Sequence, residues 1–146
     1  MKRILVTLIS LAVTCIGLYS QEPKSEEERI KEMYESIDND VTKMTDNLNL
    51  ADWQVFKVDS TLTHDVEAMV AEMKALSGRG VTNTNLYIAV QDKWAEATYL
   101  SYQTFLTEEQ WAKYLKSGAA RAKKARDKRI EKAARDEAKL KAKLKK

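Results

Sequence analysis

Proline and glycine are scarce in this chain, and their scarcity is the feature that most constrains its fold. Pro23 is the only proline among 146 residues, and glycine occurs only four times. Because these two residues disfavour helix most strongly, nearly the whole chain after Pro23 is free to be helical. Gly78 and Gly80 frame a turn, and Gly118 marks a break or a kink. The sequence therefore predicts an all-α fold.

Apolar residues recur at steps of three and four along this region, which is the spacing of one helical face. Capping-box patterns begin at Ser25 and at Thr107, where a hydroxyl residue is followed three positions later by Glu or Gln. A strand over 86–90 is the weaker alternative, because its flanks do not alternate. We expect four helices in an elongated, hairpin-like bundle with a long basic C-terminal helix. The predicted helices cover residues 25–48, 55–76, 83–105 and 107 onwards.

The first twenty residues resemble an export signal rather than part of the fold. Lys2 and Arg3 precede an apolar run over 4–16, and polar residues follow from Ser20. We expect cleavage after Ser20 and a periplasmic location. A lipoprotein cut before Cys15 and a secreted protein are the alternatives, and a permanent membrane anchor would need about 20 apolar residues.

Charge divides the remaining chain into an acidic part and a basic part. Residues 21–115 contain nine Lys and Arg against 18 Asp and Glu, a net charge of −9, whereas residues 116–146 contain 14 against four, a net charge of +10. We therefore expect a helical domain over 21–118 and a helical or partly disordered tail over 119–146.

The tail has few residues that could support a core, since it contains eight alanines but only three large aliphatic side chains. We expect the rest of the domain to stay folded without it. The tail either contacts an anionic partner or folds back on an acidic surface of its own chain or a neighbour, and a merely solvated tail is the simplest interpretation. The cations assigned to an anionic partner are Arg121, Lys123, Lys124, Arg126, Lys128, Arg129 and Lys132.

Residues for catalysis or metal binding are sparse, and we predict no enzyme, no cofactor and no tight metal site. His64 is the only histidine, and it shares a predicted helical face with Glu67. A zinc or copper site usually needs three or four ligands, so this pair requires a second chain to bind metal. A metal sensor built around His64 in a dimer is the weakest alternative. Export also argues against a nucleic-acid partner for the basic tail.

Aromatic residues lie mainly in the second half of the acidic region. Stripes at helical spacing usually form core, but Trp and Tyr also anchor protein-recognition surfaces. The aromatic residues that we take as candidates for contact with a protein partner are Trp53, Phe56, Trp94, Tyr102, Trp111 and Tyr114.

The segment Leu106-Thr107-Glu108-Glu109-Gln110 is similar to the LTxxQ motif that occurs twice in periplasmic proteins of the Spy/CpxP type. The segment 48–54 resembles the first copy, with Ala51 in place of the threonine. The helix-cap residues of the two copies are Leu50, Gln54, Leu106, Thr107 and Gln110.

This resemblance, which covers residues 48–116, implies a curved, all-helical antiparallel homodimer whose concave face holds unfolded client proteins. Some members of the family sense metals. Two features of this chain differ from the family pattern. Ala51 lacks the capping hydroxyl, and the body of the protein, residues 21–115, is acidic rather than basic. We therefore predict an exported binding protein that holds clients without ATP. The alternative is an accessory envelope protein whose basic tail docks on anionic components, including the membrane surface.

Overall fold

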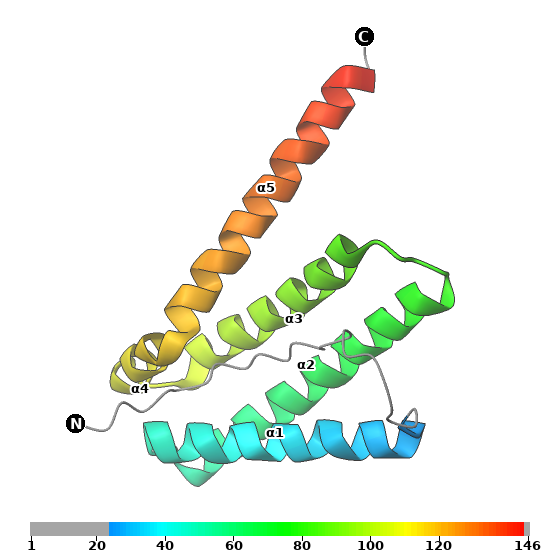
Figure 1. Cartoon of the computed structure of the whole chain (residues 1–146). Coiled ribbons are helices and arrows are strands. Elements are labelled where there is room, and N and C mark those ends of the chain that lie inside the picture. The colour runs from blue at the N-terminus through cyan, green and yellow to red at the C-terminus, as the bar shows by residue number, and fades with distance from the viewer. Residues whose placement is uncertain (1–23, 145–146) are drawn as a thin grey trace, which may run out of the picture.

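The computed structural model describes residues 24–144, and every regular element in this range is a helix. The predicted all-α fold with a long final helix is confirmed (Figure 1). The predicted signal peptide, with Cys15 and the cleavage position, lies outside the described residues. The helices are α1 (Glu26–Leu48), α2 (Asp52–Gly78), α3 (Thr84–Phe105), α4 (Glu108–Tyr114), a π-helical turn (Leu115–Ala119) and α5 (Ala120–Leu144).

Three of the four predicted helix starts are confirmed by their caps, whereas α2 begins at Asp52, three residues before the predicted start. The Ser25 hydroxyl accepts a hydrogen bond from the Glu28 amide, and the Glu28 carboxylate accepts one from the Ser25 amide. The same reciprocal pair joins Thr107 and Gln110 at the start of α4. Asn83 caps α3, which runs through the segment that offered a strand as the alternative.

Helices α2 and α3 form an antiparallel hairpin, and α1 packs across α2 (Figure 1). The core lies at the end of the hairpin where the turn between α1 and α2 meets the turn between α3 and α4. Partly buried Met33, Leu62, Phe105 and Trp111 extend it. Its buried residues are Ile37, Val41, Leu48, Leu50, Val58, Tyr102 and Leu106.

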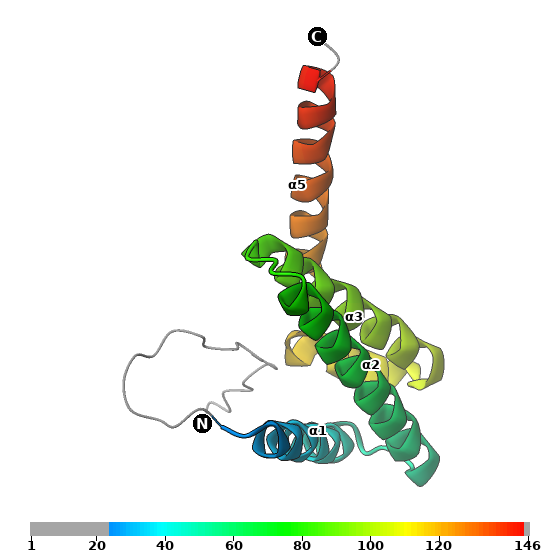
Figure 2. The same cartoon turned by 90° about the vertical axis from the view of Figure 1, so that its right-hand side faces the viewer.

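The final helix bends at Gly118, as the sequence analysis anticipated. This glycine has φ of 119° and ψ of −8° within the π-helical turn, a backbone conformation that L-residues rarely adopt. The bend brings the first turns of α5 against α3, while the second half of α5 projects away from the other helices (Figures 1 and 2). Within residues 24–144, no helix has the combination of length and apolarity needed to cross a membrane.

Candidate functional site

The two motif copies, which are 56 residues apart in sequence, lie against each other in the structure. Leu50 and Leu106 are both buried in the same core cluster. The glutamines that end the copies, Gln54 and Gln110, face each other across the contact between the two turns. The structure therefore brings together the five residues that the sequence identified as helix caps.

The side-chain amides of the two glutamines bond reciprocally. Gln54 Nε2 donates to Gln110 Oε1 at 2.7 Å, and Gln110 Nε2 donates to Gln54 Oε1 at 3.0 Å. Each oxygen also accepts from the backbone N–H of its own helix cap, Ala51 or Thr107, at 3.0 Å. Gln54 Nε2 also donates to the Phe105 carbonyl at 3.1 Å, in the turn of the other copy. The pair therefore ties the α1–α2 turn to the α3–α4 turn.

The two caps differ in one hydrogen bond. The Thr107 hydroxyl accepts a hydrogen bond from the backbone N–H of Gln110 at 3.3 Å, whereas Ala51 offers no side-chain acceptor. The backbone N–H of Gln54 instead donates to the Ala51 carbonyl at 2.8 Å. Helix α2 thus begins with half of a capping box, supplied by the glutamine alone.

Of the six aromatic candidates, only Trp53 and Phe56 are largely exposed, at 57% and 68%. They lie three residues apart at the start of α2, on one face of that helix. The Trp53 ring meets the Phe105 ring edge-on, with their centroids 6.5 Å apart. These exposed rings form the only pair among the six candidates that is positioned for contact with a partner.

The other four aromatic candidates make contacts within the chain, so they are less exposed to a partner than Trp53 and Phe56 are. Tyr102 is buried in the core. Trp111 and Tyr114 pack in an aromatic cluster with Tyr99. The Trp94 indole N–H donates to Glu72 Oε2 at 2.7 Å. Helical spacing could not distinguish these four packed aromatics from the exposed ones, because both recur at three and four residues.

Burial changes the ionisation of the two tyrosines in this group. It raises the pKa of Tyr102 far above its ordinary value. It raises the pKa of Tyr114 to about 12, although the nearby Arg126 opposes the increase. Both phenols are therefore harder to ionise than a solvent-exposed tyrosine.

An open groove of about 520 Å³ runs between α2 and α3, close to the exposed rings. Four of its nine lining residues carry small hydroxyl side chains, and another, Phe105, packs against the exposed Trp53 ring. No sequence motif predicted this groove, although the recurrence of Ser and Thr on two successive helices was a signal for it. The lining residues are Lys57, Ser60, Thr61, His64, Asp65, Ala97, Ser101, Thr104 and Phe105.

His64 lies at the wall of this groove but does not pair with Glu67. Its Nδ1 lies 2.9 Å from Oδ1 of the buried Asp65, and its ring meets the Trp94 ring edge-on. Glu67 accepts a hydrogen bond from the Tyr34 hydroxyl of α1 instead. Residues 24–144 contain no group of three or more His, Cys, Asp or Glu placed to hold a metal ion.

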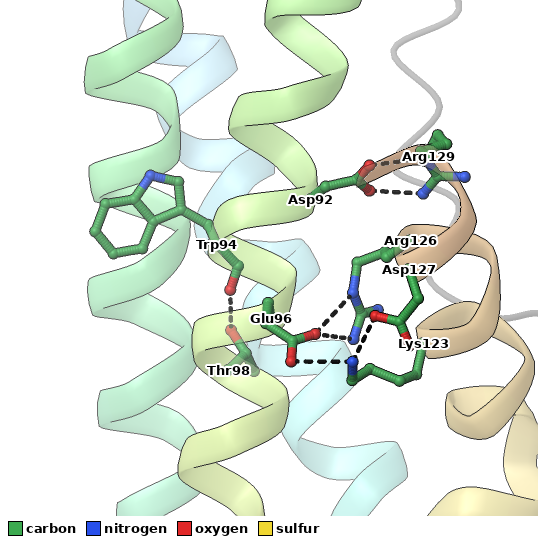
Figure 3. Close-up of polar contacts among 8 residues, drawn as sticks. All are labelled: Asp92, Trp94, Glu96, Thr98, Lys123, Arg126, Asp127 and Arg129. Atoms are coloured by element: carbon green, nitrogen blue, oxygen red, sulfur yellow. Dashed lines mark hydrogen bonds and ion pairs between the residues drawn. The ribbon is translucent and has the colours of Figure 1, made fainter. Parts of the chain in front are cut away.

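The predicted tail cations separate into two sets. Lys123, Arg126 and Arg129 point toward α3, where they pair with Asp92 and Glu96 (Figure 3). The remaining four are exposed, and they are Arg121, Lys124, Lys128 and Lys132.

The inward set forms a partly buried ion-pair cluster. Arg126, 6% exposed, donates to Glu96 Oε2 at 3.1 Å, and Arg129 binds Asp92, 7% exposed, through two bonds of 2.6 and 2.7 Å (Figure 3). The hydrogen bonds to Asp92 raise the pKa of Arg129 above its usual value. Arg126 also lies over the Tyr99 ring, 5.6 Å from its centroid. These contacts give three of the tail cations a structural role within the chain.

Comparisons with protein-family models, with curated proteins and with solved structures found no match. The function of this chain must therefore be argued from its own surfaces.

Proposed function

We propose that this chain is an exported helical binding protein that holds exposed segments of unfolded proteins without ATP. The observation that supports this proposal most directly is the groove between α2 and α3, together with the exposed rings of Trp53, which packs against the lining residue Phe105, and Phe56, which precedes the lining residue Lys57. Unfolded chains expose apolar side chains, and these rings offer them apolar surface. The proposal is also supported by the two LTxxQ-like segments, which resemble the motif of client-holding periplasmic proteins.

The groove suits a flexible and varied partner. Small side chains such as Ser60 and Ser101 let a bound chain approach the helices closely. Their hydroxyls already bond within the chain, but the oxygens keep lone pairs that can accept from a bound backbone N–H. Burying an aromatic side chain contributes roughly 1.5–3 kcal/mol. Two exposed rings thus support weak, reversible holding rather than tight recognition of one sequence.

Protection of a denatured model substrate from aggregation tests the proposal. We expect the processed chain, residues 21–146, to suppress light scattering at near-stoichiometric amounts. The double variant Trp53→Ser/Phe56→Ser should lose most of this protection while keeping its helical circular dichroism.

A matched control removes apolar surface elsewhere. Leu140 and Leu144 on α5 are 58% and 78% exposed, so Leu140→Ser/Leu144→Ser removes exposed apolar groups far from the groove. This control should protect the substrate as well as the unmodified chain does. Equal loss in both variants, or no protection by the unmodified chain, would contradict the proposal.

A further inference from the structure

Helix α5 has a face that the rest of the chain does not use. The side chains of Lys123, Arg126 and Arg129 contact α3, which fixes the side of α5 that faces the body (Figure 3). Residues 128–144 are all exposed, and the second half of the helix projects away from α1, α2 and α3 (Figure 2).

Cations fill the opposite side of α5. At 3.6 residues per turn, positions that step by three and four from Arg121 to Lys143 fall on the side facing away from Arg126. Each of these positions is Lys or Arg, and together they form what we call the outer stripe. Its residues are Arg121, Lys124, Lys128, Lys132, Arg135, Lys139 and Lys143, all of them exposed.

The outer stripe is long, and all of its charges are positive. It extends for about 33 Å at a rise of 1.5 Å per residue. The four acidic residues of α5 fall at positions 127, 131, 136 and 137, outside the stripe. Lys132 alone among the stripe residues has an ion pair within the described chain, a loose one of 3.8 Å to Asp136. The stripe therefore presents a row of cations to any partner.

The charge of the rest of the molecule favours one kind of partner. Residues 21–115 have a net charge of −9, and the inward contacts of α5 place the described part of this acidic region on the side away from the outer stripe. Such a molecule orients with its stripe toward an extended anionic surface and its body away from it. An acidic face of a second copy is a poorer partner, because several carboxylates on α1 and α2 already pair with lysines. These include Glu26, Glu32, Glu35 and Glu72.

We propose that the outer stripe of α5 docks this protein peripherally on anionic phospholipid. The interaction is electrostatic, with the helix lying along the surface and the inward ion pairs holding it at a fixed orientation to the body. Each Lys or Arg held near an anionic bilayer strengthens binding by roughly fivefold. Salt weakens the attraction, because screening acts over about 10 Å at 0.1 M.

Co-sedimentation with vesicles tests this proposal, using residues 21–146, which contain every described helix. Vesicles of equal parts phosphatidylglycerol and phosphatidylcholine are compared with vesicles of phosphatidylcholine alone, across a salt series. The stripe variant carries Lys124→Gln, Lys128→Gln, Arg135→Gln and Lys139→Gln. We expect salt-sensitive binding to the anionic vesicles only, and about 600-fold weaker binding by the stripe variant.

The control variant loses the same number of charges from the body. In this variant, Gln replaces four exposed lysines. Thermal melting of the control and stripe variants checks that both are folded. The control variant should bind nearly as well as the unmodified chain. The substituted residues are Lys31, Lys43, Lys74 and Lys113.

Three results would overturn the proposal. Equal weakening in both variants would mean that net charge alone drives binding. Equal binding to neutral vesicles would mean that exposed aliphatic side chains of α5, such as Ile130 and Leu140, insert instead. Absence of vesicle binding, together with salt-sensitive self-association that the stripe variant loses, would assign the stripe to a second copy.

Discussion

At the scale of single residues, the amide pair of Gln54 and Gln110 joins the two turns that close the core. Gln54 is only 3% exposed, and its amide nitrogen donates to both Gln110 and the Phe105 carbonyl. If the Gln54 amide is removed, the Phe105 carbonyl and Gln110 Oε1 lose a hydrogen-bond donor, which destabilises the folded state. Gln54 therefore stabilises the fold through hydrogen bonds as well as through packing.

The substitution Gln54→Glu keeps the shape of this side chain but removes both donors. We expect it to lower the free energy of unfolding by about 2 kcal/mol, measured by chemical denaturation at neutral pH. Gln103→Glu, on the exposed side of α3, is the matched control and should change little. If the two variants unfolded at the same denaturant concentration, the amide pair would not stabilise the fold.

Tyr114 makes stability sensitive to alkali. Its pKa is about 12 in the folded chain because of burial, against about 10 in an unfolded chain. The folded state therefore keeps a proton that the unfolded state loses, and the stabilisation is fully present below pH ~10 and lost as pH rises toward the folded value. Tyr114→Phe should flatten the decline of the denaturation midpoint over this alkaline range. An unchanged slope would show that Tyr114 does not contribute to it.

Residue-level prediction from sequence succeeded where the interaction is local. The caps at Ser25 and Thr107 involve residues three apart, so the sequence contains the whole motif. The contact of Gln54 with Gln110 depends on two distant turns meeting, and no local pattern indicates it. The burial of Tyr102 was missed for the same reason.

At the scale of helices, the starts of α2 and α4 provide a natural comparison. Ala51 and Thr107 have similar extended backbones, with φ of −72° and −66°. Thr107→Ala should therefore cost about 1 kcal/mol, and Ala51→Thr should add a similar amount. Urea denaturation of both variants measures the changes. If Ala51→Thr does not raise the free energy of unfolding, or Thr107→Ala does not lower it, these hydroxyl caps do not determine stability.

The first turns of α5 pack against acidic residues of α3, which agrees with the alternative that the tail folds back on its own chain. A chain that ends after Gly118 lacks the partners of Asp92 and Glu96 and uncovers Tyr99. We expect this truncation to lower the free energy of unfolding by about 2 kcal/mol. A chain that ends after Glu131 keeps the ion pairs and should melt like the longer protein. Identical melting of both truncations would contradict this assignment.

The sequence predicted α5 and gave contact with an acidic surface of its own chain as one alternative, but it did not indicate which residues would make that contact. Alternating charges with few aliphatic residues are typical of a solvated helix, and the outer stripe matches that expectation. The contacts of Arg126 and Arg129 depend on the bend at Gly118, whose direction is a tertiary property. Composition therefore predicted the exposed side of α5 but not which residues on its other side contact α3.

At the scale of the whole molecule, two surfaces with different chemistry lie on different helices. The groove with Trp53 and Phe56 belongs to α2 and α3, and the outer stripe belongs to α5. In this account the molecule holds unfolded segments at one surface while the other attaches it to an anionic bilayer. The two roles are separable, because the variants proposed for each surface leave the other unchanged.

Site-specific photo-crosslinking tests the central claim, that the surface formed by α2 and α3 contacts unfolded proteins. Benzoylphenylalanine is introduced at Phe56, beside the groove, or at Thr42, an exposed residue of α1 that serves as the control. Each protein is irradiated with a denatured model substrate and with the same substrate in its native state. The account predicts adducts with the denatured substrate from position 56 and few from position 42. Equal labelling from both positions, or labelling of the native substrate alone, would contradict it.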